Sequence, residues 1–421
     1  MTIRKFFASL LIVASLLTTA VANAEVQTYT GVGEYYMSDF ETPNVAQQRA
    51  KQRAEQDACE QAGVYVKSFS RMKNSQLVDD EIITMTSGVL KILDVQYQRE
   101  NSDKMTLIRA TIKANIDSDD VLRWLNKNSD ERADLVAEAE ELRKANAEQE
   151  RQIAALKQQL ADVKTNQDEE RITQAFAAED KIFMSNQKVI DATRAWERGN
   201  FNDAIKLCTE AITLNPNNAL ALNRRAAVFN DLRQFDSAIH DYDRAITLDP
   251  NFAVAYNNRG VAYMSLNQFD AAIRDFNRAL QINPNYASAY NNRGVAYMDG
   301  LNQFDAAIRD YDRALQLNPN FPEAYNNRGL AYAKGLKQIE RSIQDFTNAI
   351  ALNPNDADFY GNRGVSYAMA GNFERALADF NKAVELNPNN AVYYKMRGQC
   401  YRRLGDDSKA QSDFDKANQL G

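Results

Sequence analysis

The pattern of hydrophobic and polar positions repeats about every 34 residues in the second half of the chain, from residue 185 to residue 421. Seven copies follow one plan: Tyr-Asn-Asn-Arg-Gly or a variant, then Ala-Tyr, an acidic residue, Ala, an aromatic residue and Ala. Six copies end in a proline, at intervals of 34, 34, 35, 35 and 34 residues: Pro216, Pro250, Pro284, Pro319, Pro354 and Pro388. Because one copy cannot bury its own apolar face, this period predicts a solenoid of stacked units.

Each copy contains two helical periods of roughly 14 residues joined by a short turn. In the third copy the small residues Gly260 and Ala272 let the two helices approach, and Tyr263 and Phe276 fill the space beside them. Asn-Pro then ends the second helix. This small/aromatic/small/Pro signature resembles the tetratricopeptide repeat (TPR) over residues 185–421. The resemblance implies a right-handed superhelix whose inner face binds peptides or protein segments.

Residues 25–126 alternate in hydrophobicity and predict a small α+β domain of order β-α-β-α-β-β with a final short helix. The expected elements are a strand over 26–38, a helix over 44–62 that Gly63 ends, a strand over 64–72, a helix over 78–87, a hairpin over 93–97 and 108–116, and a helix from 117. The alanine-rich helix ending Ala62-Gly63-Val64 and the Ser87-Gly88 before the hairpin resemble the N-terminal domain of the flagellar-assembly protein FlgT. That likeness implies an envelope location.

Residues 129–166 contain neither Gly nor Pro and follow a heptad pattern. The two core positions hold Leu135, Leu142, Gln149, Leu156 and Val163, and Ala139, Asn146, Ile153 and Leu160. The pattern favours a self-associating coiled coil, as a dimer or a trimer, over a single solvated helix. Residues 167–184 then continue as a linking helix that caps the first repeat through Ile172, Phe176, Ile182 and Phe183.

Residues 1–24 have the pattern of a signal peptide. Arg4 and Lys5 precede a short apolar run, and Ala22-Asn23-Ala24 is a cleavage site that places Glu25 at the mature N-terminus. The run is short for a membrane span. We therefore expect a periplasmic or secreted bacterial protein without a membrane span.

Charge and composition exclude several classes of function. Without Arg4 and Lys5, 48 basic residues stand against 57 acidic ones, which argues against a nucleic-acid partner. The single histidine, His240, makes a multi-histidine metal site untenable, and we expect no metal and no cofactor. Cys208 and Cys400 occupy core positions of the first and last repeats, whereas Cys59 is either free or bridges two subunits.

The chain shows no phosphate-binding loop, dinucleotide motif or nucleophile elbow, so the candidate functional features are surfaces. In the TPR family the first helix of each repeat lines the concave face. Carried over to this chain, that lining predicts a partner-binding set of Asn257, Val261, Met264, Asn291, Val295, Met298, Asn326, Leu330, Val365 and Met369. Asparagine amides would bond a peptide backbone, unless they only join helices, and the apolar row would take a side chain.

Arginine and aspartate recur together in every repeat except the first. The arginines are Arg225, Arg259, Arg293, Arg328, Arg363 and Arg397, and the aspartates are Asp241, Asp275, Asp310, Asp345, Asp379 and Asp413. An unpaired buried arginine is costly, so the pattern predicts structural ion pairs rather than an anion site.

The favoured function is a non-enzymatic, exported scaffold that multimerises through the coil and binds a partner protein in the TPR groove. The order signal–coil–TPR resembles periplasmic TolA-binding cell-division coordinators, from which the inserted α+β domain departs. An assembly factor for a flagellar, pilus or secretion machine is the alternative. A cell-wall enzyme that acts through residues 25–126 is a remote third possibility.

Overall fold

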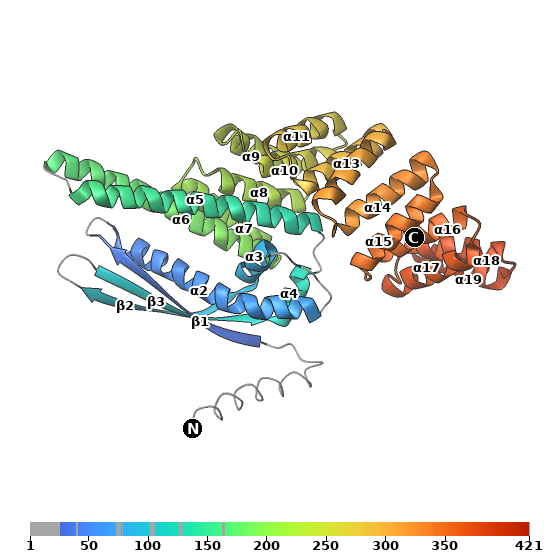
Figure 1. Ribbon diagram of the computed structural model, residues 1–421, viewed down its shortest axis with the longest axis horizontal. Helices are drawn as coiled ribbons and strands as arrows, with labels where there is room; N and C mark the ends of the chain where they lie inside the picture. The colour runs from blue at the N-terminus through green and yellow to red at the C-terminus, as the bar shows by residue number, and fades with distance from the viewer. Residues whose placement is uncertain are drawn as a thin grey trace, which may run out of the picture. The chain divides into compact units, whose positions relative to one another are not determined.

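The computed structural model describes residues 26–38, 41–72, 77, 79–101, 106–125, 129–161 and 165–420. The chain forms two compact units, residues 1–127 and residues 128–421 (Figure 1). The expected signal peptide, residues 1–24, lies outside the described residues.

The N-terminal unit is a three-stranded antiparallel sheet with helices. Its elements in chain order are β1 (Val26–Met37), α2 (Pro43–Met72), α3 (Asp79–Val89), β2 (Lys91–Asn101), β3 (Thr106–Asp117) and α4 (Ser118–Leu125). The strand order is β1-β3-β2, with β3 paired to both neighbours. The expected small α+β domain and its hairpin are therefore present.

An alanine face on α2 packs against the sheet. Its members are fully buried: Ala46, Ala50, Ala54, Ala58 and Ala62. The backbone of β1 approaches this face so closely that a Cβ on Gly31 would lie 2.0 Å from the Ala54 carbonyl oxygen. Small residues on both elements thus set the helix-to-sheet distance.

The predicted strand over residues 64–72 is wrong, because α2 continues to Met72. Val66 and Ser70 are buried and follow Ala62 at intervals of four residues, so the helical face extends past the expected stop. Gly63 does not end the helix: a Cβ there would meet only Ile82, at 3.9 Å. The cost of about 1 kcal/mol for a glycine inside a helix is offset by this additional burial.

The C-terminal unit begins with two long helices and continues as helix pairs. The long helices are α5 (Ser129–Ala161) and α6 (Asn166–Glu197). The first helices of the following repeats are α8 (Ala219–Asp231), α10 (Ala253–Ser265), α12 (Ala287–Val295), α14 (Pro322–Ala331), α16 (Ala357–Met369) and α18 (Ala391–Arg403). The second helices are α7 (Phe201–Leu214), α9 (Phe235–Leu248), α11 (Phe269–Ile282), α13 (Phe304–Leu317), α15 (Ile339–Leu352), α17 (Phe373–Leu386) and α19 (Asp407–Leu420).

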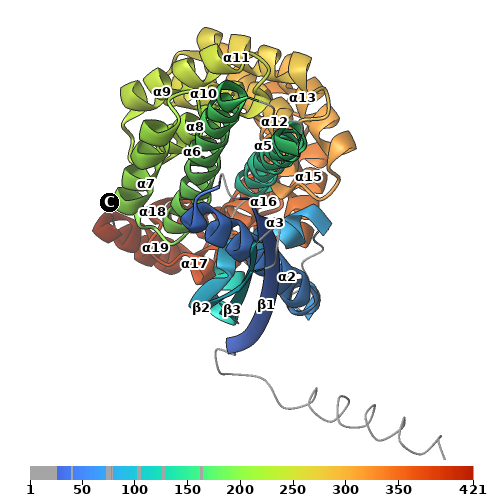
Figure 2. The same ribbon diagram turned by 90° about the vertical axis from the view of Figure 1, so that its left-hand side faces the viewer.

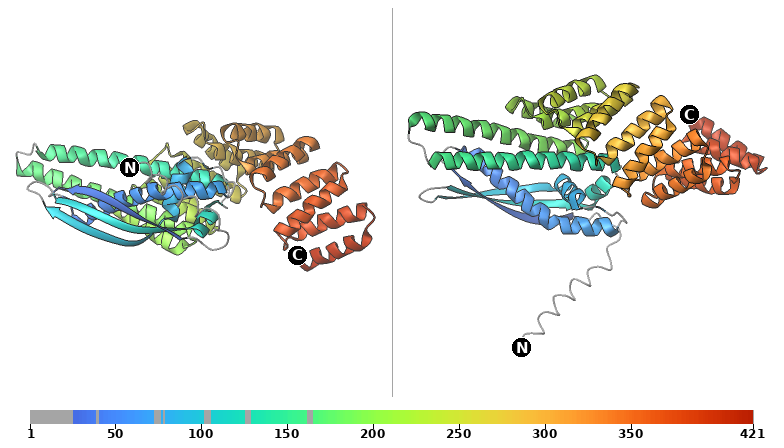
Figure 3. Two further views of the ribbon diagram at one scale, coloured as in Figure 1. Left: turned by 60° about the horizontal axis from the view of Figure 1, so that its bottom comes forward. Right: turned by 45° about the horizontal axis from the view of Figure 1, so that its top comes forward.

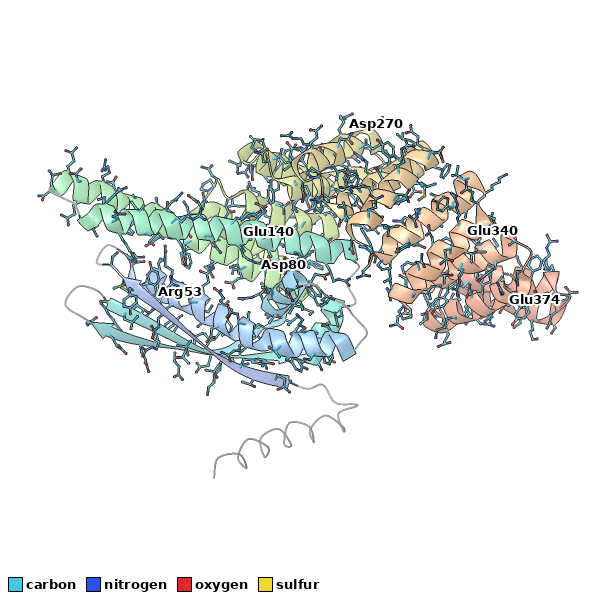
Figure 4. All side chains as sticks on the ribbon, viewed as in Figure 1. Arg53, Asp80, Glu140, Asp270, Glu340 and Glu374 are labelled. Carbon is cyan, nitrogen blue, oxygen red and sulfur yellow. The ribbon has the colours of Figure 1, made fainter. Side chains whose placement is uncertain are left out.

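These helices stack as the 34-residue period predicts (Figure 3), and α6 packs against α7 as the first helix of repeat 1. Large aromatic residues of the second helices fill the core and are almost fully buried: Tyr242, Phe276, Tyr311, Phe346 and Phe380. A mainly α, TPR-like solenoid preceded by a small α+β domain is thereby confirmed. The second helices also carry acidic residues in their first turns, where the helix dipole favours them, and Figure 4 labels Asp270, Glu340 and Glu374.

The two 35-residue intervals have a local structural cause. The first helices of repeats 4 and 5 end in single π-helical turns, η1 (Ala296–Gly300) and η2 (Tyr332–Leu336). In repeat 3 the Gln268 amide bonds the Tyr263 carbonyl, five residues back, whereas in repeat 4 the Gln303 amide bonds the Tyr297 carbonyl, six residues back. The extra residue is therefore absorbed as a bulge in the helix. A Cβ on Gly300 would lie 2.2 Å from the Phe269 ring, so the bulge requires glycine there.

Candidate protein-binding surface

The asparagines predicted to bind a partner form a ladder between repeats. Asn292 Nδ2 donates to Asn257 Oδ1 at 3.1 Å, and Asn327 Nδ2 donates to Asn291 Oδ1 at 3.0 Å. Asn362 continues the series with a 2.9 Å bond to Asn326. Asn257 and Asn291 are also buried. These bonds join neighbouring first helices, which is the inter-helix role that the sequence left open.

The predicted apolar row is divided by burial. Met298 is only 4% exposed and belongs to the repeat core, whereas Met369 is 54% exposed. The two methionines differ in local structure: Met298 lies in the π-helical turn η1, four residues after the close-contact glycine, whereas Met369 is the last residue of α16, five residues after its glycine. Five members are half-buried beside the inter-repeat core: Val261, Met264, Val295, Leu330 and Val365.

Each recurring arginine forms a two-bond ion pair with the aspartate of its own repeat. In repeat 6, Arg363 Nε and Nη2 each lie 2.8 Å from an Asp379 carboxylate oxygen. The other pairs have the same geometry, with donor–acceptor distances of 2.7–2.9 Å: Arg225–Asp241, Arg259–Asp275, Arg293–Asp310, Arg328–Asp345 and Arg397–Asp413. The hydrogen bonds that Arg363 donates to the Asp379 carboxylate raise the pKa of Arg363, and burial raises the pKa of Asp345 against the opposing effect of Arg328.

The third guanidinium nitrogen of each arginine bonds the preceding repeat. Arg259 Nη1 lies 2.5 Å from an Asp243 oxygen, and Arg328 Nη1 lies 2.6 Å from an Asp312 oxygen. The corresponding acceptors of Arg225, Arg293, Arg363 and Arg397 are Thr209, Asn277, Thr347 and Asn381. The arginines therefore connect three helices each, and their donors are used in holding the solenoid together.

Helix α5 lies inside the arc of the repeats (Figure 2), in contact with α6, α8, α10 and α12. Its residues Ala137, Leu142 and Ala145 pack against an apolar cluster that includes Leu220 and Val254 of the first helices. Asn146 Oδ1 accepts a hydrogen bond of 3.1 Å from Asn186 of α6. The N-terminal half of the concave face is thus covered by a helix of the same chain.

A buried charge pair fixes α5 to α8. Glu138 of α5 is 6% exposed and bonds Arg224, and it accepts a 3.3 Å hydrogen bond from Asn223 Nδ2. Burial raises the pKa of Glu138, and Arg224 and Asn223 oppose that rise. The Arg224 guanidinium also stacks on the Trp196 ring, 4.5 Å from its centroid.

This pair was not identified from the sequence, although a signal exists. At the place of Arg224, one residue before the recurring arginine, the next four repeats carry asparagine: Asn258, Asn292, Asn327 and Asn362. Repeat 2 alone replaces that asparagine with a second arginine, opposite Glu138. A departure from the repeat pattern therefore marks the contact with α5.

The heptad pattern of α5 faces its own chain. Leu135, Gln149 and Ile153 are buried, and Gln149 Nε2 donates 2.7 Å to the carbonyl oxygen of Glu179 in α6. Asn146 of α5 bonds Asn186 of α6, and Gln149 of α5 bonds Glu179 of α6. The residue numbers of the α6 partners decrease as those of α5 increase, so the two helices run antiparallel. Self-association of the coil between chains stays a prediction, and it would have to replace these contacts.

The remaining candidate residues have ordinary surroundings. Cys208 and Cys400 are buried, and burial raises their pKa values to about 12 and about 11. Cys59 is part-buried against the N-terminal core, and His240 is on the surface beside Asp241.

Among the described residues, no group of three or more histidine, cysteine, aspartate or glutamate side chains is arranged to hold a metal ion. The described helices include none that is long and apolar enough to cross a membrane.

Family models of the tetratricopeptide repeat match residues 253–286, 322–356, 357–390 and 380–412, and a model described as a TPR repeat matches residues 228–267 and 301–335. The matches over 253–286, 322–356 and 357–390 each contain one helix pair, whereas those over 228–267 and 301–335 each contain the second helix of one repeat and the first helix of the next. The sequence resemblance to this family is therefore confirmed.

Solved structures of repeat proteins are also similar to the chain. MamA is 27% identical over 38% of this chain and 93% of its own, with a TM-score of 0.36. YrrB, described as a TPR protein with an unusual peptide-binding site, is 27% identical over 44% of this chain and 95% of its own, with a TM-score of 0.36. A tetratricopeptide repeat protein from Parabacteroides merdae is 23% identical over 56% of this chain and 93% of its own, with a TM-score of 0.46. No curated protein matches the chain.

Proposed function

The chain is a tetratricopeptide repeat protein, and we propose that it is an exported scaffold that holds a segment of a partner protein on the concave face of its last repeats. Helix α5 contacts the first helices α6, α8, α10 and α12, and further along the solenoid lie α14, α16 and α18. Repeat surfaces of this kind present extended binding faces.

One observation carries the proposal: Met369 and Val392, on the neighbouring helices α16 and α18, are 54% and 55% exposed. Val392 lies six residues before the close-contact glycine of its repeat, as Asn186 lies six residues before Ala192 of repeat 1. Asn186 bonds α5, so this position faces the concave side. Two large apolar side chains exposed on such a surface favour protein binding.

Export, location and self-association are further parts of the proposal, and sequence patterns support them. The signal-peptide pattern of residues 1–24 and the likeness of residues 25–126 to an envelope domain favour a periplasmic or secreted protein of envelope or cell-division complexes. A role in assembling a flagellar, pilus or secretion machine is the alternative within the same class. The heptads of residues 129–166 favour homo-oligomers, in a form that would require α5 to leave its present contacts.

The test is a pull-down from envelope extract with the chain from Glu25 onward. We expect Met369→Asp with Val392→Asp to lose the captured protein. The matched control is Leu352→Asp, which changes a residue that is also exposed (38%) but lies on the second helix α15. Equal capture by both variants would place the binding site elsewhere, and loss by the control alone would place it on the second helices.

A further inference from the structure

We infer that the concave face of repeats 1 to 4 is a second binding site, built for an amphipathic helix with a carboxylate that pairs with Arg224, and that α5 is its replaceable occupant. The inference rests on the proposed function in one respect, since it names the kind of partner segment that a TPR groove of this chain accepts. It concerns a different part of the groove, so the two proposals are tested separately.

The first argument is that α5 is an incomplete ligand for this surface. Asn223 and Arg224 are 0% and 2% exposed, yet among the described residues Asn223 Oδ1 and Arg224 Nε have no hydrogen-bond partner. Buried donors and acceptors that lack a hydrogen-bond partner weaken binding. A helix that offers a carboxylate to Nε and Nη2 of Arg224, and an amide or ammonium donor to Asn223 Oδ1, would satisfy these groups.

The second argument is that the contact discriminates between ligands more than it stabilises the fold. A buried ion pair offsets much of its Coulomb attraction by desolvation, but it penalises any ligand that lacks the matching charge. The α5 side chains that pack on the first-helix cluster are two alanines and Leu142, and the outer side of α5 carries the exposed residues Glu140, Arg143 and Lys144. Leu135 and Ile153 of α5 are buried as well, so α5 is held by a small number of large apolar side chains.

The third argument is that the receptor side is specific to one repeat. Arg224 replaces the asparagine that repeats 3 to 6 use at the equivalent position, in Asn258, Asn292, Asn327 and Asn362. In those repeats Asn292, Asn327 and Asn362 bond the preceding first helix, a purely structural role. Repeat 2 thus carries a charge-recognition residue at a position where the solenoid itself requires only asparagine.

The test uses the chain from Glu25 onward and a labelled synthetic helix of residues 129–161 as the probe. The Glu138→Arg chain repels its own α5 from Arg224, and we expect it to bind the unmodified probe at least about tenfold more tightly than a probe with Glu138→Arg. The Arg224→Glu chain should show the opposite preference. The unmodified chain should bind the unmodified probe more weakly than the Glu138→Arg chain does, because its own α5 competes.

Folding is checked with the chain that carries both Glu138→Arg and Arg224→Glu, which should regain the helicity and thermal unfolding of the unmodified chain. Absence of probe binding by both single variants would overturn the inference and make α5 a fixed part of the fold. Equal binding of both probes would overturn the role of Arg224. If an equimolar mixture of the two single variants forms a stable species of twice the mass, the ligand is α5 of a second copy rather than a foreign helix.

Failure of this titration leaves the pull-down result on Met369 and Val392 unchanged. Conversely, loss of partner capture by the last repeats does not affect which of the two probes each single-variant chain binds more tightly. The two outcomes therefore distinguish a failure of the inference from a failure of the proposed function.

Discussion

The first and the last repeats follow one sequence pattern but present different concave faces. On α8, Asn223 and Arg224 bond Glu138 of α5, whereas at the same two positions of α14, Asn326 and Asn327 bond the asparagines of neighbouring repeats. Toward the C-terminus, Met369 and Val392 are exposed. The difference teaches that the shared pattern builds the solenoid, and that the residues which depart from it decide what each part of the groove contacts.

The ion-pair ladder is common to both halves of the groove, so breaking it should have the largest effect and the same effect in each half. We expect Arg259→Ala and Arg363→Ala each to lower the free energy of unfolding by about 2–4 kcal/mol, because Asp275 or Asp379 would be left buried without its partner. Urea titration followed by circular dichroism measures both changes.

The surface variant Arg274→Ala serves as the control for this comparison, because Arg274 is exposed on α11. A somewhat larger loss of stability at Arg259 than at Arg363 is compatible with the ladder, because Arg259 also bonds the carboxylate of Asp243 whereas Arg363 bonds the hydroxyl of Thr347. Similar small losses at all three sites would contradict a structural role for the ladder.

The labelling rates of the two buried cysteines allow the local stability of the first and last repeats to be compared. Cys208 lies on α7 of repeat 1 and is 0% exposed, whereas Cys400 lies on α18 of repeat 7 and is 2% exposed. At pH 8 both thiols are protonated, because burial raises their pKa values to about 12 and about 11, and labelling requires local opening. We expect a thiol reagent to label Cys400 at least about tenfold faster than Cys208, as measured by mass spectrometry of tryptic peptides. Faster labelling of Cys208 would show that the end next to α5 is the less stable one.

A smaller effect is expected from the asparagine ladder. Asn291→Ala removes the acceptor of the 3.0 Å bond from Asn327 and should lower stability by about 1 kcal/mol, measured as a shift of the urea midpoint. Asn285→Ala is the control, because Asn285 is exposed in the loop before α12. If Asn291→Ala abolished partner capture without changing stability, the result would support the partner-binding role that the sequence predicts for Asn291.

The smallest expected effect is the pH dependence of the contact between α5 and α8. Burial raises the pKa of Glu138 above its ordinary value, so the docked state binds a proton more tightly than the undocked state. Docking should therefore strengthen as pH falls from above the raised pKa toward about 4.3, the ordinary value for glutamate. Hydrogen exchange of the α5 amides, corrected for the intrinsic chemical rate, should be slower at pH 5 than at pH 8. The Glu138→Gln chain should lose this difference, and a difference that persists in it would assign the effect to another group.

Much of the solenoid could be predicted from the sequence, because a repeated pattern states each packing rule several times. The pairing of Arg363 with Asp379 follows from their co-occurrence, since the arginine and the aspartate appear or are missing together. The end of α2 could not be predicted from Gly63, because the packing of Val66 and Ser70 outweighs the local preference of one glycine. Met264 and Met298 occupy the same place after the close-contact glycine of their repeats, but Met298 lies in η1 and is buried, whereas Met264 is half-buried.

The sequence pattern could not identify which helices the apolar positions of α5 pack against. A heptad stripe specifies that a helix is covered, but its apolar positions fit a second α5 as well as α6 and the repeats. Asn146 shows the same ambiguity. Its heptad position predicts a contact with another coil helix, whereas its side chain accepts a hydrogen bond from Asn186, forty residues away in the same chain. Long-range pairs of this kind have no local signature.

The π-helical turns of repeats 4 and 5 have a consequence for how this chain can change over time. A single-residue insertion in η1 or η2 lengthens the spacing between Arg293 and Asp310, and between Arg328 and Asp345, to 17 residues, yet both pairs keep bond lengths of 2.7–2.8 Å. The insertion leaves the packing of the other repeats unchanged, so repeats on either side can be duplicated, deleted or exchanged without a compensating change. Lineages of such an array can therefore vary in length in two ways, by whole units and by single residues hidden within a helix.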